Sequence, residues 1–252
     1  MNFEILFLGT GAADRMALEQ EKDFSDKNKR RCSAALLNDH ILIDCGPHIL
    51  NSLSAAQIPL ANITDILITH LHEDHFCADC ITEIAQANPA LKIWVREDAN
   101  VTLHENYTIQ KMKCFKQYNI GELKVTSVPA NHDSCPQHFS IQCGAKKLFY
   151  GLDGAWFLGE TVRFMKNQKY DMFIFDATVG DYLGDYRMGE HNSIPMIRMM
   201  LPSMKTLNII DENTHIVLSH LAVCLHKPYT ETCEITMNDN LTVAFDGLKL
   251  EI

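Results

Sequence analysis

Short apolar runs alternate with segments of helical spacing along most of the chain. Runs rich in aliphatic and β-branched residues predict strands, because turn residues bound them and they are too short for helices. The predicted strands are 3–8, 33–37, 41–45, 65–69, 92–95, 123–128, 139–143, 147–150, 172–175, 215–218, 241–245 and 248–252. The predicted helices are 48–57, 78–87, 157–167 and 192–200. Asp98 is placed as the N-cap of a further short helix toward Tyr107.

Turn residues indicate how these elements are connected. Asn38-Asp39 forms a tight turn between two strands, and Asp246-Gly247 carries a type I′ signal between the last two, so both strand pairs are expected to be hairpins. Residues 14–31 are polar and predict a long loop. No linker or shift in composition divides the chain, which predicts one domain over 1–252. Terminal hairpins with strand–helix units between them favour an α/β fold, a four-layer αββα sandwich of two sheets with helices outside.

Composition and charge narrow the classes of partner. The chain has 252 residues, 46% of them hydrophobic, which is enough to bury a core without disulfides or a partner. Its formal net charge is −10, the wrong sign for holding a nucleic acid by its phosphates. No stretch approaches the ~20 apolar residues of a membrane-spanning helix, so no membrane association is expected.

The cysteines and the amino terminus predict a cytoplasmic protein. The nine cysteines are an odd number without the spacing of a disulfide framework, which favours reduced thiols. The first residues lack the basic segment of a signal peptide. Cys77 and Cys80 form a C-x-x-C pair, but no second pair accompanies it, so we expect two thiols on one helix face rather than a zinc knuckle.

Four potential metal ligands lie within six residues at the end of a predicted buried strand: His70, His72, Asp74 and His75. In an extended strand end, residues two apart point the same way, so His70 and His72 can reach one ion together. Asp74 and His75 lie at the following turn and can point to a second ion beside the first. Imidazole and carboxylate are ligands that zinc, iron and manganese accept. The segment therefore predicts a metal site.

This motif resembles the H-x-H-x-D-H signature of the metallo-β-lactamase superfamily, and the resemblance covers the whole chain. Asp44 in Leu42-Ile43-Asp44-Cys45-Gly46 matches the acid that supports the family's metal loop. The resemblance implies two divalent metal ions, zinc first, with manganese or iron as alternatives. The ligands that it implies are His70, His72, His132 and Asp153 on one ion, and Asp74, His75, Asp153 and His220 on the other.

A second segment indicates the branch of the superfamily. Asp176-Ala177-Thr178 followed by His191-Asn192-Ser193 is similar to the phosphodiesterase branch, which includes ribonuclease Z and the phosphoribosyl cyclic phosphate phosphodiesterase of the carbon–phosphorus lyase pathway. The resemblance implies that His191 protonates the leaving oxygen or stabilises the phosphoryl charge, and that Asp176 orients it. An imidazole held by a carboxylate is an acid poised near neutral pH. Asp74 is counted with these two as catalytic.

Other segments favour a small substrate. Only 56 residues separate His75 from His132, and they form ordinary strands and helices without a basic arm for tRNA. Gly9-Thr10-Gly11 and Arg31-Cys32-Ser33 have counterparts in the small cyclic phosphate enzyme. Residues 12–30 lack that enzyme's cysteines, so no structural zinc is expected. Arg31 either contacts the phosphate or is a solvated loop residue.

We therefore expect a metal-dependent hydrolase, a phosphodiesterase that cleaves a small, cyclic phosphate ester with a dinuclear-metal hydroxide as nucleophile. The alternatives are a thioester or lactone hydrolase on the same fold, a tRNA 3′-processing endonuclease, and a non-catalytic metal-binding protein. The expected partner is the small-molecule substrate, with no nucleic acid and no membrane. A homodimer is possible, since Met196, Met199, Met200 and Met204 recur at helical spacing, although a core role is favoured for them.

Overall fold

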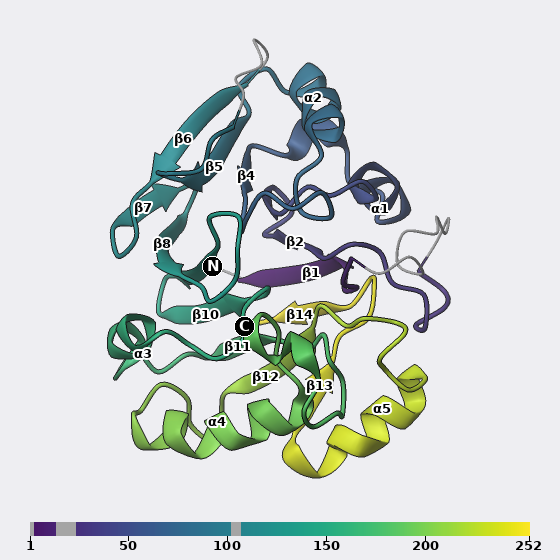
Figure 1. Cartoon of the computed structure of the whole chain (residues 1–252). Coiled ribbons are helices and arrows are strands. Elements are labelled where there is room, and N and C mark those ends of the chain that lie inside the picture. The colour runs from purple at the N-terminus through teal and green to yellow at the C-terminus, as the bar shows by residue number, and fades with distance from the viewer. Residues whose placement is uncertain (1–2, 14–23, 102–106) are drawn as a thin grey trace.

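The computed structural model describes residues 3–13, 24–101 and 107–252. Their strands form two seven-stranded sheets, with strand orders β14-β1-β2-β3-β4-β5-β6 and β13-β12-β11-β10-β9-β8-β7. Figure 1 shows the sheets in the middle of the molecule and the helices on its outer sides. The arrangement confirms the predicted α/β sandwich of four layers.

The first sheet carries the amino-terminal part of the chain and the segment that follows it. Its strands are β1 (Glu4–Gly9), β2 (Ala34–Leu37), β3 (Ile41–Ile43), β4 (Asp65–Leu67), β5 (Lys92–Arg96), β6 (Thr108–Met112) and β14 (Lys249–Glu251). β3, β4, β5 and β6 run parallel, whereas β14, β1, β2 and β3 pair antiparallel. Leu42 and Ile66 pack in one apolar cluster with Leu53 of α1 (Ile49–Ala55) and Ile81 of α2 (Ala78–Ala87). Both helices therefore cover the outer face of this sheet, with the short turn η1 (Leu60–Asn62) between them.

The second sheet carries most of the remaining strands. They are β7 (Gln117–Ile120), β8 (Leu123–Pro129), β9 (Gln137–Cys143), β10 (Lys146–Gly151), β11 (Met172–Asp176), β12 (His215–Ser219) and β13 (Leu241–Val243). Phe173 and Phe175 pack outward against Met165 of α3 (Gly159–Met165) and Ile197 of α4 (Ile194–Thr206). The remaining helical elements are η2 (Tyr186–Gly189), α5 (Tyr229–Thr236) and η3 (Met237–Asp239).

The largest apolar cluster fills the space between the two sheets. Ile41 and Ile43 of β3 belong to it together with Ile141, Met172 and other side chains of the second sheet, whereas Leu42 belongs to the outer cluster. This alternation follows the two-residue period of a strand whose two faces are both buried. The packing holds the ends of β4, β8, β10, β11 and β12 in fixed positions, and these ends carry the candidate site.

The two predicted hairpins have different outcomes. β2 and β3 pair antiparallel, and Asn38 and Asp39 between them have φ angles of +47° and +61°, so the first hairpin is confirmed. The second is wrong. β13 pairs parallel with β12 in the second sheet, and β14 pairs antiparallel with β1 in the first, so Asp246 and Gly247 lie where the chain crosses between sheets.

A buried arginine cluster, made of Thr10, Arg30, Arg31 and Asp246, explains this crossing. One Asp246 carboxylate oxygen accepts the Thr10 hydroxyl at 2.7 Å, and the other accepts the Arg31 backbone N–H at 2.8 Å. The Arg30 guanidinium donates to the Thr10 hydroxyl at 2.7 Å. Burial, only partly offset by these hydrogen bonds and arginines, raises the pKa of Asp246 to about 6. The carboxylate thus binds distant parts of the chain instead of closing a local turn.

Several other predictions are corrected. Asp98 lies in a turn and binds Arg96 at 2.6 Å instead of beginning a helix, and residues 102–106 of that predicted helix lie outside the described residues. β6, β7 and α5 were not predicted. Of the loop predicted over 14–31, residues 14–23 also lie outside the described part, and 24–31 contain no helix or strand.

The cysteines and methionines are partly as expected. All nine cysteines are free thiols. Cys77 is the N-cap of α2, and its sulfur accepts the Cys80 backbone N–H, so the two thiols lie together at the start of this helix. In α4, Met196 and Met204 are buried, but Met199 is 66% exposed and does not belong to the core.

None of the helices in the described parts of the chain is both long and apolar enough to cross a membrane.

Candidate metal centre

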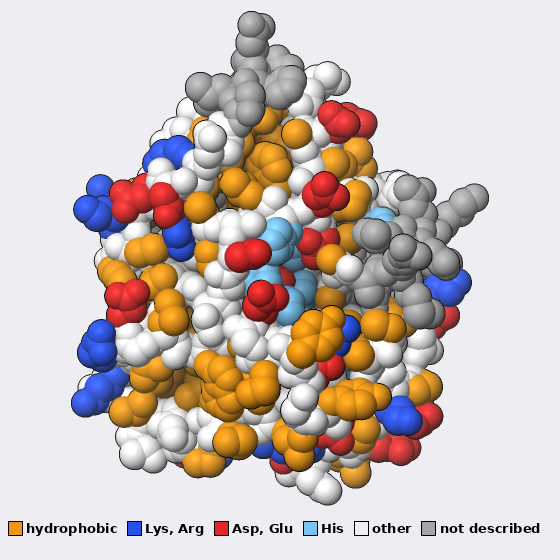
Figure 2. Space-filling model, viewed as in Figure 1, with side chains coloured by type: hydrophobic (Ala, Val, Ile, Leu, Met, Phe, Trp, Pro, Cys, Tyr) orange, Lys and Arg blue, Asp and Glu red, His pale blue; other side chains and the backbone are white. Residues whose placement is uncertain are grey.

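The predicted ligands meet at one edge of the two sheets. His70–His75 follow β4, His132 follows β8, Asp153 follows β10, and His220 follows β12. Figure 2 shows histidine side chains gathered at the centre of one face, with acidic side chains around them. A cavity of about 280 Å³ lies at this edge, and the predicted ligands that line it are His72, Asp74, His132, Asp153 and His220. We call His70, His72, Asp74, His75, His132, Asp153 and His220 the ligand cluster.

Three histidines form the first half of the ligand cluster. His70 Nε2 lies 2.9 Å from His72 Nδ1, and His132 Nε2 lies 3.3 Å from the same atom. Potential ligand atoms of all three lie within 4.8 Å of one another. Facing ring nitrogens at these distances can share one cation, as structural and catalytic zinc sites do.

Asp74, His75 and His220 form the second half. His75 Nε2 lies 3.1 Å from an Asp74 carboxylate oxygen and 3.3 Å from His220 Nε2. His75 and His220 are completely buried, and Asp74 is nearly so. The first two histidines of the six-residue motif thus lie in one group and its last two members in the other.

Asp153 lies between the two halves. Its Oδ2 is 3.0 Å from His75 Nε2 and 3.1 Å from His220 Nε2, and its Oδ1 is 3.9 Å from His132 Nε2. Oδ2 is nevertheless buried without a hydrogen-bond partner among the described residues. A buried carboxylate oxygen without a proton donor, surrounded by ring nitrogens, is the arrangement that a bound cation satisfies. The donor set thus fits divalent metal ions.

Each of three histidines is held by one ring nitrogen while the other faces the cluster. His75 Nδ1 contacts Asp44 at 2.8 Å, and Asp44 also accepts the Thr69 backbone N–H at 2.7 Å. His70 Nδ1 lies 3.1 Å from the Thr69 hydroxyl. His220 Nδ1 lies 2.7 Å from the Thr178 hydroxyl. Such contacts fix ring orientation and leave the second nitrogen for a metal, and they place Asp44 where the sequence predicted it.

The charges of the ligand cluster favour a cation as well. Burial lowers the pKa of His70 to about 2 and also lowers that of His132. Burial alone would lower the pKa of His220 too, but Asp153, Asp176 and Asp74 outweigh it and raise the pKa to about 10. The same competition raises the pKa of His75. The buried carboxylates therefore stabilise positive charge at this position, which protons or metal ions can supply.

Asp176 and His191 form a pair at the edge of the ligand cluster. His191 Nδ1 lies 2.8 Å from an Asp176 carboxylate oxygen, and the other oxygen accepts the backbone N–H groups of Thr178 and Asn192. The His191 ring stacks on the His220 ring at 5.4 Å between centroids. Burial would lower the pKa of His191, but the charge and hydrogen bond of Asp176 raise it. The structure thus brings together the two residues that the sequence predicted as acid and orienting carboxylate.

Arg31 is corrected by the structure. Its side chain is buried, its guanidinium lies 3.7 Å from Asp246, and it packs over the Phe24 ring. It does not line the cavity, so it is neither a solvated loop residue nor placed to contact a substrate. Among the described residues that line the cavity, the one Lys or Arg side chain is Arg187 of η2. The sequence analysis missed Arg187, because its segment carries no motif that indicates a role.

Thr178 and His138 make contacts near the ligand cluster that the sequence did not indicate. The Thr178 hydroxyl contacts ring nitrogens of both His220 and His191, at 2.7 and 3.2 Å. His138 is 1% exposed, burial lowers its pKa to about 4, and neither of its ring nitrogens has a hydrogen-bond partner among the described residues. It packs against Gly154, where a Cβ atom would lie 2.8 Å from His138 Nε2. The neighbouring Asp153 has a φ angle of +55°, so this packing supports an unusual backbone at the bridging position.

Comparisons with known proteins find sequence similarity over part of the chain. The family model described as anti-Pycsar protein Apyc1 matches residues 3–78. Zinc phosphodiesterase ELAC protein 1 is 37% identical over 79 residues in both Mus musculus and Homo sapiens. That match spans 30% of this chain but only 19% of each relative.

Solved structures extend the likeness to the whole chain. A diphosphatase from the PhnP family has a TM-score of 0.76 at 16% identity, over 100% of this chain and 98% of that one. The metallo-β-lactamase fold protein YhfI from Bacillus subtilis has a TM-score of 0.73 at 15% identity, over 100% of both chains. The short form of human tRNase Z has a TM-score of 0.69 at 21% identity, over 98% of both. At these identities the likeness is one of fold.

Proposed function

We propose that this chain, which has the metallo-β-lactamase fold, is a metal-dependent phosphodiesterase that acts on a small phosphate ester. The observation that carries the proposal is the Asp176–His191 pair beside the ligand cluster. A thioester releases a thiolate, which can leave without a proton, whereas an alkoxide that leaves from phosphorus needs a proton donor. A half-buried imidazole with a raised pKa, held by a carboxylate, is suited to that task.

The two halves of the ligand cluster would hold two divalent metal ions, zinc first. His70, His72 and His132 would hold one, Asp74, His75 and His220 the other, and Asp153 would reach both. When bound, such a pair supplies a nucleophile at neutral pH and stabilises the oxygens of an in-line displacement at phosphorus.

His191 would act through its Nε2 atom. Asp176 is 2.8 Å from Nδ1 and holds the proton there, so Nε2 is the nitrogen left to face a bound ester. In the protonated ring, Nε2–H donates to the leaving oxygen, and Asp176 stabilises the positive charge until the transfer. The Asp176 carboxylate is itself fixed by the backbone N–H groups of Thr178 and Asn192, so the imidazole is oriented before substrate arrives.

Two further points support this assignment and a small substrate. The similar proteins include a zinc phosphodiesterase and a diphosphatase. The net charge of −10 opposes binding of a polyanion such as tRNA. A small, cyclic ester remains our first candidate within this class.

The test is hydrolysis of bis(p-nitrophenyl) phosphate and of a 2′,3′-cyclic nucleoside phosphate by the zinc-loaded protein, each compared with His191→Ala at equal metal content. We expect the native protein to hydrolyse both and the variant to lose most turnover of the cyclic ester, because its leaving group is an alkoxide, whereas p-nitrophenolate leaves without a proton. Turnover of the cyclic ester that does not depend on His191 would remove the assignment of the leaving-group acid. No turnover from protein shown to hold two metal ions would refute the phosphodiesterase and favour thioester and lactone substrates.

A further inference from the structure

A second cavity lies beside the ligand cluster, and we call it the side cavity. It measures about 310 Å³ and is lined by Asp181, Tyr182, Ile194, Cys224, Leu225, His226, Lys227, Thr232 and Ile235. Cys224 and Leu225 also line the cavity at the ligand cluster. The two cavities therefore meet at the connection between β12 and α5.

The same two segments of chain wall both cavities. Thr178 lines the first cavity, and Asp181 and Tyr182 follow it directly along the chain toward the second. His226 Nε2 lies 2.7 Å from the Ala177 carbonyl oxygen. Because a carbonyl oxygen only accepts, Nε2 is the donor, and this hydrogen bond holds the two segments together. Because Leu225 lines both cavities, a ligand with its phosphorus at the ligand cluster would enter the side cavity past this residue.

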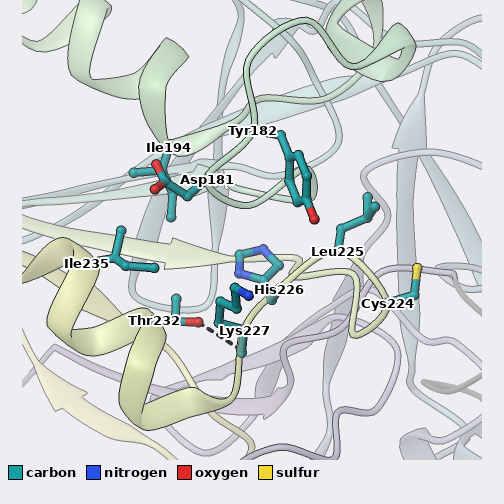
Figure 3. A pocket seen from close by; sticks show the side chains of 9 residues that line it. All are labelled: Asp181, Tyr182, Ile194, Cys224, Leu225, His226, Lys227, Thr232 and Ile235. Atoms are coloured by element: carbon teal, nitrogen blue, oxygen red, sulfur yellow. Dashed lines mark hydrogen bonds between the residues drawn. The ribbon is translucent and has the colours of Figure 1, made fainter.

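The walls of the side cavity indicate what it can take. Ile194, Leu225 and Ile235 provide apolar surface from three separate elements. Figure 3 shows the ring of Tyr182 across the cavity from Thr232 and Ile235 of α5, and this side chain is 52% exposed. An exposed aromatic face opposite aliphatic side chains is a surface for a flat ring.

Polar groups complete the lining. Asp181 supplies an acceptor whose charge is partly balanced by Arg198 at 3.2 Å, and Lys227 supplies a donor. The Thr232 hydroxyl donates to the Lys227 carbonyl oxygen, which ties this segment to α5 (Figure 3). With one charge of each sign at its edge, the side cavity favours an uncharged ring with polar substituents over a second anion.

We propose that the side cavity binds an aromatic or heteroaromatic group esterified to the substrate phosphate. This inference rests on the proposed function, since it places the phosphate at the ligand cluster. It adds that Tyr182 and Ile235 determine specificity for the organic group of the ester.

The test measures binding and needs no turnover. Benzylphosphonate and methylphosphonate both present a phosphonate, but only the first carries a ring, on a CH₂ that stands where an ester oxygen would be. Their Kd values for the zinc-loaded protein are compared by calorimetry. We expect benzylphosphonate to bind about tenfold more tightly.

Variants test which residues cause the preference for benzylphosphonate over methylphosphonate. Tyr182→Ala removes one wall, and Ile235→Trp fills the cavity, so each is expected to bring the ratio of the two Kd values close to one. Tyr182→Phe keeps the ring and should keep the preference. Leu183→Ala is the matched control, because Leu183 is the next residue, is 80% exposed and lines neither cavity.

The outcomes separate the two proposals. Equal Kd values in the native protein, or a preference that survives Tyr182→Ala, would overturn the role of the side cavity while leaving the phosphate site in place. If neither phosphonate binds the zinc-loaded protein, the proposed function fails and this inference fails with it. Tyr182 is at the surface, so its alanine variant tests the proposal even if Ile235→Trp does not fold.

Discussion

Two buried polar clusters lie near the ends of the strands, and their groups are partnered differently. In the buried arginine cluster, a chain of hydrogen bonds runs from Arg30 through Thr10 to Asp246, whose second oxygen accepts from Arg31. In the ligand cluster, Asp153 Oδ2 has ring nitrogens at 3.0 and 3.1 Å but no hydrogen bond within the described structure. The first cluster is complete in itself, whereas the second has room for a cation.

This difference in hydrogen-bond partners gives a criterion that distinguishes structural from functional polar groups. Both clusters are buried and both contain a carboxylate, so burial and charge do not separate them. The separation lies in whether each polar atom has a partner in the protein, because an unpaired buried acceptor costs free energy that must be recovered elsewhere. The following predictions test this distinction, beginning with the largest expected effect on the site.

Asp153→Asn is expected to abolish both metal binding and turnover. The amide has one neutral oxygen in place of the carboxylate that approaches both halves of the ligand cluster, so neither ion keeps its full set of ligands. Metal content after gel filtration and the rate of bis(p-nitrophenyl) phosphate hydrolysis measure the two effects. Retention of two tightly bound ions in this variant would show that Asp153 does not connect the two halves.

His191→Ala is expected to keep both metal ions and to lower kcat by about 10²–10⁴-fold, the usual contribution of a general acid. His191 must be protonated to act, and Asp176 raises its pKa above the ordinary value. Activity of the native protein should therefore be present below this pKa and fall as pH rises through it. The pH profile of kcat in the variant should lack that fall, and a fall of the same position in both proteins would assign it to another group.

Thr178→Val is expected to weaken metal affinity by about 10–100-fold, the range for a residue that orients a ligand. Without the hydroxyl, the nearest acceptor for His220 Nδ1 is the Asp176 oxygen at 3.5 Å, which already serves His191. Thr178→Ser keeps the hydroxyl and should restore affinity. Competition with a chelator measures it. Equal affinity in both variants would mean that the hydroxyl does not hold His220.

Asp246→Ala is expected to have the smallest effect on the site and a clear effect on stability. The Arg31 backbone N–H and the Thr10 hydroxyl would lose their buried acceptor, which should cost about 3 kcal/mol of unfolding free energy. Urea unfolding measures this cost, and the number of metal ions bound per folded chain should not change. Loss of metal from a variant that remains folded would show that the buried arginine cluster is also needed for metal binding, which would contradict its purely structural role.

The His70–His75 part of the ligand cluster was predictable because its information is local. Four ligand-type residues in six positions at a strand end need no knowledge of the remaining fold. His132, Asp153 and His220 are far apart in the sequence, and only the resemblance to a known family implied that they join this motif. Most core strands were predictable for the same reason, since both faces are buried and the runs are strongly apolar.

The errors arose where local patterns compete with distant contacts. Asp246-Gly247 has the composition of a hairpin turn, but Asp246 binds Thr10 and Arg31 from the other end of the sequence. β6 and β7 have mostly exposed or half-buried residues, so they lack the apolar alternation of a core strand. α5 buries only Thr232 and Thr236, which gives no apolar stripe. Arg31 and Thr178 acquire their roles from residues that sequence spacing does not place beside them.

The crossing at Asp246 and Gly247 has a consequence for how the protein is made. On a ribosome, His70–His75 emerge long before β14, yet β14 is the edge strand beside β1 in the sheet that supports them. The nascent chain therefore carries most of its ligands while one strand edge is still open, and such edges invite misassembly. Chains interrupted before β14 would therefore leave the outer edge of β1 unpaired.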